Sequence, residues 1–246
     1  MTSSLFSLVF PVYNERENIK ILIPELLDNF RNRNIEIIIV DDGSTDGTRE
    51  EIEEFQKRPS NARIVLIKRD SLGGIGSALI DGYNAASGAY IISCDADLSF
   101  PVKSIVDIAN ELEANTCDLV LGCRHTKGSY YEAPNYRIFS KKLVSRFGNI
   151  FLRLFTGIPI HDFSANCRGI KKSVWENLAL KSRDNFMLFE MVWRSYRLGF
   201  RVKEIPVNFY DRKFGSSKLR LGRAALRFFV QFWKLKFGRA GFEPRG

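Results

Sequence analysis

The feature that most constrains the fold is a regular alternation of apolar runs and helical patterns in the first half of the chain. Five short runs rich in Ile, Val and Leu cover residues 4–12, 35–42, 62–69, 89–95 and 118–123. Between them, apolar residues recur at helical spacing over residues 17–32, 46–57, 75–87 and 102–115. Strands that are apolar on both faces and alternate with helices are typical of parallel sheets covered on both sides. The pattern predicts an α/β protein with a Rossmann-like, mainly parallel sheet flanked by helices.

The second half of the chain is less regular. Helical patterns cover residues 135–156, 186–199 and 219–237, and a strand pattern covers residues 201–210. No internal repeat or long linker separates the halves, so we expect the second half to complete a site begun in the first. This organisation predicts one domain over residues 1–218, made of halves 1–123 and 124–218, followed by a C-terminal segment 219–246.

The charge of the chain is divided unequally between these halves. Residues 1–123 carry 20 acidic and 11 basic residues, a net −9, whereas residues 124–246 carry 8 acidic and 26 basic residues, a net +18. A strongly basic half indicates an anionic partner, such as phosphates, nucleic acid or a lipid surface. The alternative is a basic face that only contacts water.

Composition indicates where such a protein works. Hydrophobic residues make up 45% of the chain and charged residues 26%, which excludes a disordered or fibrous protein. The four cysteines form no CxxC pair, which disfavours a disulfide scaffold or a zinc site and favours a reducing, cytoplasmic compartment. No run approaches the roughly 20 apolar residues of a membrane span, and the N-terminus lacks a basic leader. We therefore expect neither a transmembrane helix nor a signal peptide.

Polar clusters follow three of the apolar runs. They are PVYNE at residues 11–15, DDGSTDGT at residues 41–48 and DADLSFP at residues 95–101. Because functional groups of open α/β sheets collect at the carboxyl ends of strands, we expect the three clusters to converge on one crevice. Each cluster by itself could instead be a turn or a helix cap. The glycines at residues 71–78 match no phosphate-binding fingerprint, and we interpret them as a turn into a helix starting near Ile75.

The cluster after the fourth run has the clearest chemistry. Asp95 and Asp97 are separated by one residue, and no Lys or Arg lies beside them in the sequence. Two carboxylates so close repel each other unless a cation lies between them. Hard oxygen ligands suit Mg²⁺ or Mn²⁺, which commonly bridge to substrate phosphates. The alternative is a solvated loop with a helix cap.

Together these motifs resemble the inverting family 2 glycosyltransferases of GT-A fold. Two later segments, Gly122-Cys123-Arg124 and RKFGSSK at residues 212–218, narrow the resemblance to the polyprenyl-phosphate glycosyltransferases, which include the dolichol-phosphate mannosyltransferases. The resemblance runs from about residue 5 to residue 220. One departure is Ser99, where some relatives have a Gln that can reach the metal.

The resemblance implies a role for each matching position. The base and ribose of a nucleotide sugar would contact Pro11, Tyr13, Glu15, Val40 and Asp42. The diphosphate and an Mg²⁺ or Mn²⁺ ion would be held by Asp95, Ala96 and Asp97, with Ser99 reaching the ion through water. Donor and acceptor phosphates would contact Arg124, Arg212 and Lys218, with Arg137 and Ser140 also at the acceptor phosphate. Asp97, Arg124, Arg212 and Lys218 are the expected catalytic residues.

The implied activity is the inverting transfer of a hexose, mannose from GDP-mannose, onto dolichyl or another polyprenyl phosphate. UDP-glucose and UDP-N-acetylglucosamine are the alternative donors. A basic nucleic-acid-binding protein, or a nucleotide-sugar-binding subunit without catalysis, are alternatives of other classes. Carboxylates at the site disfavour nucleic acid because they would repel phosphate without a metal.

A lipid phosphate acceptor is already ionised near neutral pH, so its attack requires no general base. It requires a cationic clamp, which the basic half supplies. In relatives with hydroxyl acceptors, an acid near Asp162 acts as a base. Here we expect Asp162 to orient Arg168 or to cap a turn. We expect His125, which follows Arg124, to lie at the surface, and the alternative is that it contacts a phosphate.

Two basic and aromatic helical patterns indicate how the protein reaches a lipid acceptor. Over residues 220–237 the basic residues form one narrow stripe beside a broad apolar face, and residues 135–156 repeat the pattern. Such helices suit the interface of an anionic bilayer. We therefore expect amphipathic interface helices and a peripheral location on the cytosolic face of a membrane. The alternative is that one or both helices pack against the core.

Overall fold

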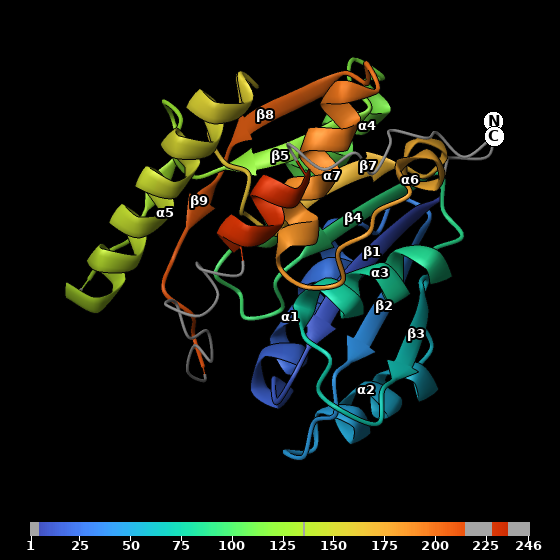
Figure 1. Cartoon of the computed structure of the whole chain (residues 1–246). Coiled ribbons are helices and arrows are strands. Elements are labelled where there is room, and N and C mark those ends of the chain that lie inside the picture. The colour runs from blue at the N-terminus through green and yellow to red at the C-terminus, as the bar shows by residue number, and fades with distance from the viewer. Residues whose placement is uncertain (1–4, 135, 215–227, 236–246) are drawn as a thin grey trace.

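The computed structural model describes residues 5–134, 136–214 and 228–235. Its central sheet has seven strands in the order β3-β2-β1-β4-β7-β5-β8 (Figure 1). The strands are β1 (Phe6–Val12), β2 (Ile35–Asp41), β3 (Arg63–Lys68), β4 (Tyr90–Cys94), β5 (Leu119–Cys123), β7 (Cys167–Lys171) and β8 (Val202–Pro206). All neighbouring pairs are parallel except those made by β7, which is antiparallel to both β4 and β5. The expected α/β fold with a mainly parallel sheet is confirmed.

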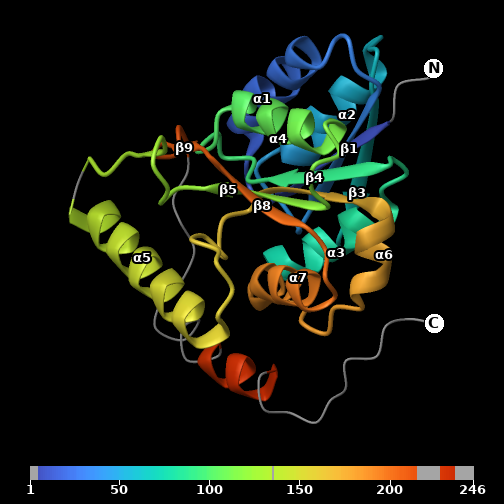
Figure 2. The same cartoon turned by 90° about the horizontal axis from the view of Figure 1, so that it is seen from above.

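Helices cover both faces of this sheet (Figure 2). One face carries α1 (Arg16–Asn29), α2 (Thr48–Lys57) and α4 (Val102–Glu113). The other carries α3 (Ile75–Ala85), α6 (Lys172–Leu178) and α7 (Phe186–Arg197). Because the buried strands lie between two helical layers, their side chains are apolar on both faces, as the sequence pattern indicated.

Two features of the second half depart from the sequence prediction. The segment 201–210 is two strands, β8 and β9 (Asn208–Phe209), and β9 pairs with β6 (Tyr130–Tyr131) outside the main sheet. The strand β7, which the sequence pattern did not reveal, lies between β4 and β5. The two halves of the chain therefore share one sheet.

Helix α5 (Tyr136–Thr156) lies at one side of the molecule, outside the two layers (Figures 1 and 2). Its Leu152 and Asn149 are buried, but most of its apolar side chains are exposed. The exposed set is Tyr136, Phe139, Leu143, Val144, Phe147, Ile150, Leu154 and Phe155. None of the described helices has the combination of length and apolarity needed to cross a bilayer.

The predicted last helix is described over residues 228–235. It packs against α5 and α7, and the ring of Phe232 lies 5.8 Å from that of Phe151 and 5.7 Å from that of Phe189. Phe232 is buried, whereas Phe229 and Trp233 are more than 40% exposed. The described part of this helix therefore has a core-facing side as well as an exposed one. The boundary predicted at residue 218 lies outside the described residues.

Candidate active site

The loops after β1 and β2 interlock at the carboxyl edge of the sheet. The backbone N–H of Asp42 donates to the carbonyl of Val12 over 2.9 Å, and that of Asn14 donates to Ser44 Oγ over 2.8 Å. In return, the N–H of Thr45 donates to Asn14 Oδ1 over 2.8 Å. Asn14 has φ +57°, a conformation that Asn tolerates better than most residues. Two of the three predicted polar clusters are therefore joined before any ligand binds.

Asp42 connects this edge to the glycine turn. Its carboxylate accepts hydrogen bonds from the N–H groups of Gly73, over 2.9 Å, and Gly74, over 2.8 Å, and pairs with Arg69 Nη1 at 2.8 Å. Gly74 has φ +87°, and α3 begins at the next residue, so the glycine segment is the turn that the sequence predicted. In this structure the Asp42 carboxylate positions that turn.

The remaining residues predicted to contact the nucleotide lie at the same edge. Pro11 of β1 stands opposite Val40 of β2, and Tyr13 and Glu15 follow β1 at partly exposed positions. The side chain of Val40 is completely buried in the core between β2 and α3. Because this side chain is buried, only the backbone of Val40 is left to contact the nucleotide, and that contact stays a prediction.

Asp95 is held by a chain of hydrogen bonds that leads into the core. Asn166 Nδ2 donates to Asp95 Oδ1 over 2.9 Å, Ser93 Oγ donates to Asn166 Oδ1 over 2.7 Å, and Tyr83 and Ser93 share a 2.8 Å hydrogen bond. Burial, together with the charge of Asp97, raises the pKa of Asp95 to about 7. The negative charge of an ionised Asp95 is therefore not fully compensated by the positive charges near it.

Asp97 has a cationic partner that lies far from it in the sequence. Arg212 Nη2 lies 3.0 Å from Asp97 Oδ2, although no Lys or Arg lies beside the two acids along the chain. The other carboxylate oxygen accepts the N–H of Ser99 over 3.0 Å, across Leu98 at φ +60°. The Asp97 carboxylate is thus bound both by the loop that follows β4 and by Arg212 of the basic second half of the chain.

The carboxylate pair suits a divalent ion. The buried Oγ of Ser99, whose backbone N–H contacts Asp97, has no hydrogen-bond partner among the described residues, so it is a third candidate oxygen ligand. No group of three or more His, Cys, Asp or Glu residues able to hold a metal occurs in the described part of the chain. An ion here would therefore take its remaining ligands from water and substrate oxygens, as Mg²⁺ usually does.

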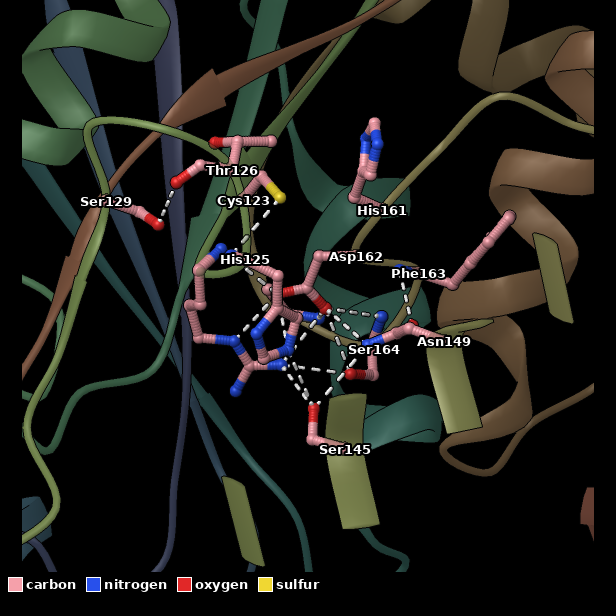
Figure 3. Close-up of polar contacts among 12 residues, drawn as sticks. Cys123, His125, Thr126, Ser129, Ser145, Asn149, His161, Asp162, Phe163 and Ser164 are labelled. Carbon is pink, nitrogen blue, oxygen red and sulfur yellow. Dashed lines mark hydrogen bonds and ion pairs between the residues drawn. The ribbon is translucent and has the colours of Figure 1, made fainter. Parts of the chain in front are cut away.

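Arg124 follows β5 and is fixed by Asp162. Asp162 is labelled in the polar network drawn in Figure 3. The Arg124 guanidinium pairs with the Asp162 carboxylate through Nε at 2.8 Å and Nη2 at 3.0 Å. Its central carbon stands 5.4 Å from the ring centre of Phe209 and 5.8 Å from that of Tyr131. The charges of Arg124 and Arg212 both act to lower the pKa of Asp95.

Two expectations about this region need correction. Asp162 orients Arg124 rather than Arg168, whose guanidinium is bound by backbone carbonyls of Phe163, Ala165 and Leu188. The expected cap is present, because Asp162 accepts the N–H groups of Ser164 and Ala165.

His125 is the second correction. It is not at the surface: its side chain is 7% exposed and its ring stacks on Tyr131. Instead Tyr131 of β6 and Ser145 of α5 cover it. Burial lowers the pKa of its imidazole, so His125 is neutral near pH 7.

The remaining predicted phosphate contacts are placed only in part. Ser140 lies on α5, and its side chain is half-buried. Lys218 and the side chain of Arg137 lie outside the described residues. Sequence reasoning missed Asn166, whose only signal was its place in the polar segment SANCRG before an unrecognised strand.

Comparison with known proteins identifies the family. Residues 7–178 match the family described as Glycosyl transferase family 2. Polyprenol monophosphomannose synthase of Mycolicibacterium smegmatis is 28% identical over 217 residues, which cover 86% of this chain and 79% of that protein. Dolichol-phosphate mannosyltransferase of Pyrococcus furiosus is 31% identical over 232 residues, which cover 93% of this chain. The match covers 63% of the length of the Pyrococcus protein.

Solved structures support the fold. Glucosyl-3-phosphoglycerate synthase from Mycobacterium tuberculosis, in complex with Mn²⁺, uridine diphosphate and glucosyl-3-phosphoglycerate, has a TM-score of 0.70 at 20% identity. The match covers 94% of this chain and 79% of that one. The predicted GT-A fold is thereby confirmed. With the motifs at three strand ends and the family match over most of its length, the chain belongs to the family 2 glycosyltransferases.

Proposed function

We propose that this chain transfers mannose from GDP-mannose, with inversion, onto dolichyl or another polyprenyl phosphate. The observation that carries the proposal is the meeting of opposite charges at one strand edge. Asp97 lies 3.0 Å from Arg212, and Arg124 is close enough for its charge to act on Asp95. A site that brings two phosphate-bearing substrates together needs carboxylates to hold a metal ion and basic side chains to bind the phosphates. The names of the two mannose-transferring relatives support the sugar and the lipid acceptor.

On the donor side, Asp95, Asp97 and Ser99 would hold Mg²⁺ or Mn²⁺. Bound there, the ion would neutralise the charge that develops on the diphosphate leaving group. Pro11, Tyr13, Glu15 and Asp42 line the edge where the base and ribose would lie. Arg212, which lies 3.0 Å from Asp97, would also contact a diphosphate oxygen.

On the acceptor side, Arg124 would bind the lipid phosphate, with Arg137, Ser140 and Lys218 as further predicted contacts. An ionised phosphate oxygen attacks the anomeric carbon of the sugar as the bond from that carbon to the diphosphate breaks. The electron pair of the broken bond leaves with the nucleoside diphosphate, so no proton has to be removed from the acceptor. One displacement inverts the anomeric configuration.

The exposed apolar face of α5 supports an anionic membrane surface as the place of reaction. Ser145, on the inner side of α5, lies 3.5 Å from Arg124 Nη2, so the helix adjoins the proposed acceptor site. Basic residues, including Lys142 and Arg146, occur on the same helix. A peripheral position on the cytosolic side would bring the Arg124 site to the level of the lipid phosphate.

The test is a transfer assay with Mn²⁺, dolichyl phosphate and radiolabelled GDP-mannose, UDP-glucose or UDP-N-acetylglucosamine, followed by extraction into organic solvent. We expect label in the lipid phase from GDP-mannose, formed about 100-fold or more slowly by the Asp97→Asn variant. If label enters the lipid phase from a UDP-sugar instead, that UDP-sugar is the donor and GDP-mannose is not. Absence of lipid label with every donor would contradict the proposal.

A further inference from the structure

Asp162 is a buried carboxylate at the centre of the polar network shown in Figure 3. It lies in the loop between α5 and β7, and its side chain has no exposed surface. Its Oδ2 accepts a hydrogen bond from Arg124 Nε, and its Oδ1 accepts bonds from Arg124 Nη2, the N–H groups of Ser164 and Ala165, and Asn149 Nδ2. Both carboxylate oxygens are therefore fully engaged.

The pairing with Arg124 fixes the guanidinium in direction as well as in position. Two parallel bonds of 2.8 and 3.0 Å form the forked geometry in which Arg and a carboxylate are held in one plane. Ser164 Oγ accepts a further bond from Nη2 over 2.9 Å. Rotation of the guanidinium would break all three bonds, so the orientation that Arg124 presents to a ligand is set by this loop.

Asn149 extends the same network to α5. Its Nδ2 lies 3.3 Å from Asp162 Oδ1, and its Oδ1 accepts the N–H of Phe163 over 2.9 Å. Asn149 is 3% exposed, whereas most apolar side chains of α5 are open to solvent. The polar inner side of α5 is thus joined to Arg124 through Asp162.

The environment of Asp162 does not suit a general base. Burial by itself would raise the pKa of this carboxyl, but the charge and the hydrogen bonds of Arg124 outweigh burial and hold the pKa well below its usual range. A base must take up a proton during the reaction, and here proton uptake would break the pair with Arg124.

We propose that Asp162 is a positioning residue of the acceptor site, which aims Arg124 at the acceptor phosphate and joins it to α5. The inference rests on the proposed function, because the phosphate that Arg124 receives is that of the lipid acceptor. It assigns Asp162 a role through Arg124 and no direct contact with the reacting atoms.

The experiment is a double-mutant cycle of Asp162→Asn, Arg124→Gln and both together, assayed with a short-chain, water-soluble polyprenyl phosphate. We expect each single variant to raise the acceptor KM on the order of tenfold or more, with the KM for GDP-mannose changed less than twofold. In the Arg124→Gln background, Asp162→Asn should raise the acceptor KM no further, because the two residues act as one unit. The dependence of kcat on pH should keep its shape in Asp162→Asn.

Asp118→Asn is the matched control. Asp118 lies at the opposite end of β5 and forms the same forked pair with Arg201, through Nε at 3.0 Å and Nη2 at 2.8 Å. This variant should leave the acceptor KM unchanged. Thermal unfolding of every variant shows whether Asp162→Asn folds. If it does not, Ser164→Ala tests the same guanidinium contact, and we expect a smaller rise in acceptor KM.

The outcomes separate the two proposals. If the wild-type chain labels no polyprenyl phosphate, the proposed function is wrong. If the wild type is active and Asp162→Asn leaves the acceptor KM unchanged, the positioning role is wrong. A third outcome would make Asp162 a base instead. In that case Asp162→Asn lowers kcat alone, its effect adds to that of Arg124→Gln, and the acidic limb of the pH profile disappears.

Discussion

At the scale of single residues, the two carboxylates of the DAD motif have different surroundings. Asp95 is held by the neutral amide of Asn166, and Asp97 by the cation Arg212 and the N–H of Ser99. Because only Asp97 has a direct cationic partner, the two groups cannot be equivalent. The same residue pattern thus supplies one carboxylate that is paired with a cation and one whose charge is opposed by burial.

The first prediction concerns Asp97→Asn. We expect kcat to fall about 100- to 1,000-fold, because the change removes one charge from the groups that would hold the metal and the diphosphate. Stability should change by only about 1 kcal/mol, since the ion pair with Arg212 is partly exposed. Transfer assays and thermal unfolding measure the two effects, with Asp107→Asn on the exposed side of α4 as control. Full activity of Asp97→Asn, or of wild type in excess chelator, would sink the idea.

The second prediction follows from the pKa of about 7 at Asp95. An unfolded Asp has a pKa near 3.9, so between about pH 4 and pH 7 the native state binds a proton that the unfolded state releases. The contribution of Asp95 to stability therefore falls as pH rises through this window. In chelator, Asp95→Asn should stabilise the fold at pH 8, on the order of 2 kcal/mol, and less at pH 5.

Urea unfolding of wild type and Asp95→Asn at pH 5, 6.5 and 8 measures this difference. The exposed Asp28→Asn serves as control and should show the same small effect at each pH. A stability difference for Asp95→Asn that does not grow with pH would show that burial does not oppose this charge.

At the scale of elements, the strand that the sequence did not reveal directly follows Asn166, which contacts Asp95. β7 has the sequence CRGIK, which places Arg168 and Gly169 inside a five-residue strand. Arg168 is completely buried and is satisfied by backbone carbonyls, an arrangement that no hydrophobic period indicates. A side chain at Gly169 would come within 2.5 Å of Ile108 on α4, so close packing requires glycine there.

Elements of the first half were predictable because each carries its own local pattern. The runs of β1 to β5 and the helices α1 to α4 have the periods of buried strands and amphipathic helices. The carboxyl-end rule then brought Asp42, Asp95 and Asp97 to one edge. The partners Asn166 and Asp162 could not be predicted, because their contacts depend on where an antiparallel strand inserts.

The third prediction concerns the exposed face of α5. Phe147 is 66% and Leu154 is 75% exposed. Phe147→Glu with Leu154→Glu should weaken binding to anionic vesicles by about tenfold or more, because each side chain would otherwise bury apolar surface in lipid. Wild-type binding should weaken as salt rises, since each basic residue near the lipid contributes roughly 1 kcal/mol.

Vesicle sedimentation measures binding, and circular dichroism checks that the thermal unfolding of the double variant is unchanged. Tyr196→Glu, at a residue of α7 that is 44% exposed, is the matched control and should bind as wild type does. Equal binding by the α5 variant and wild type would show that α5 does not face the membrane.

At the scale of the whole molecule, the acidic and basic halves are not separable units. β5 belongs to the first half, yet its neighbours in the sheet are β7 and β8 of the second. β4 likewise pairs with β7 on the side away from β1. The change from net negative to net positive charge along the chain therefore occurs within one sheet, at the site where the two kinds of side chain meet.

The fourth prediction follows from this shared sheet. A fragment of residues 1–123 should not unfold cooperatively, because β5 would have no strand to pair with and β4 would lose one edge. Urea unfolding followed by circular dichroism should give a broad, shallow change for the fragment and a sigmoidal transition for the whole chain. A sharp transition in the fragment would show that the first half folds by itself.

The interlocked loops after β1 and β2 have a further consequence for the energetics of donor binding. Asn14, Ser44 and Thr45 hold one another in place without a ligand, so a nucleotide would meet a surface whose shape already exists. Little conformational entropy is then lost on binding. Calorimetry with a nucleoside diphosphate should give a heat-capacity change that the buried area of the ligand accounts for, and Asn14→Gly, which frees the loops, should weaken binding mainly through a less favourable entropy.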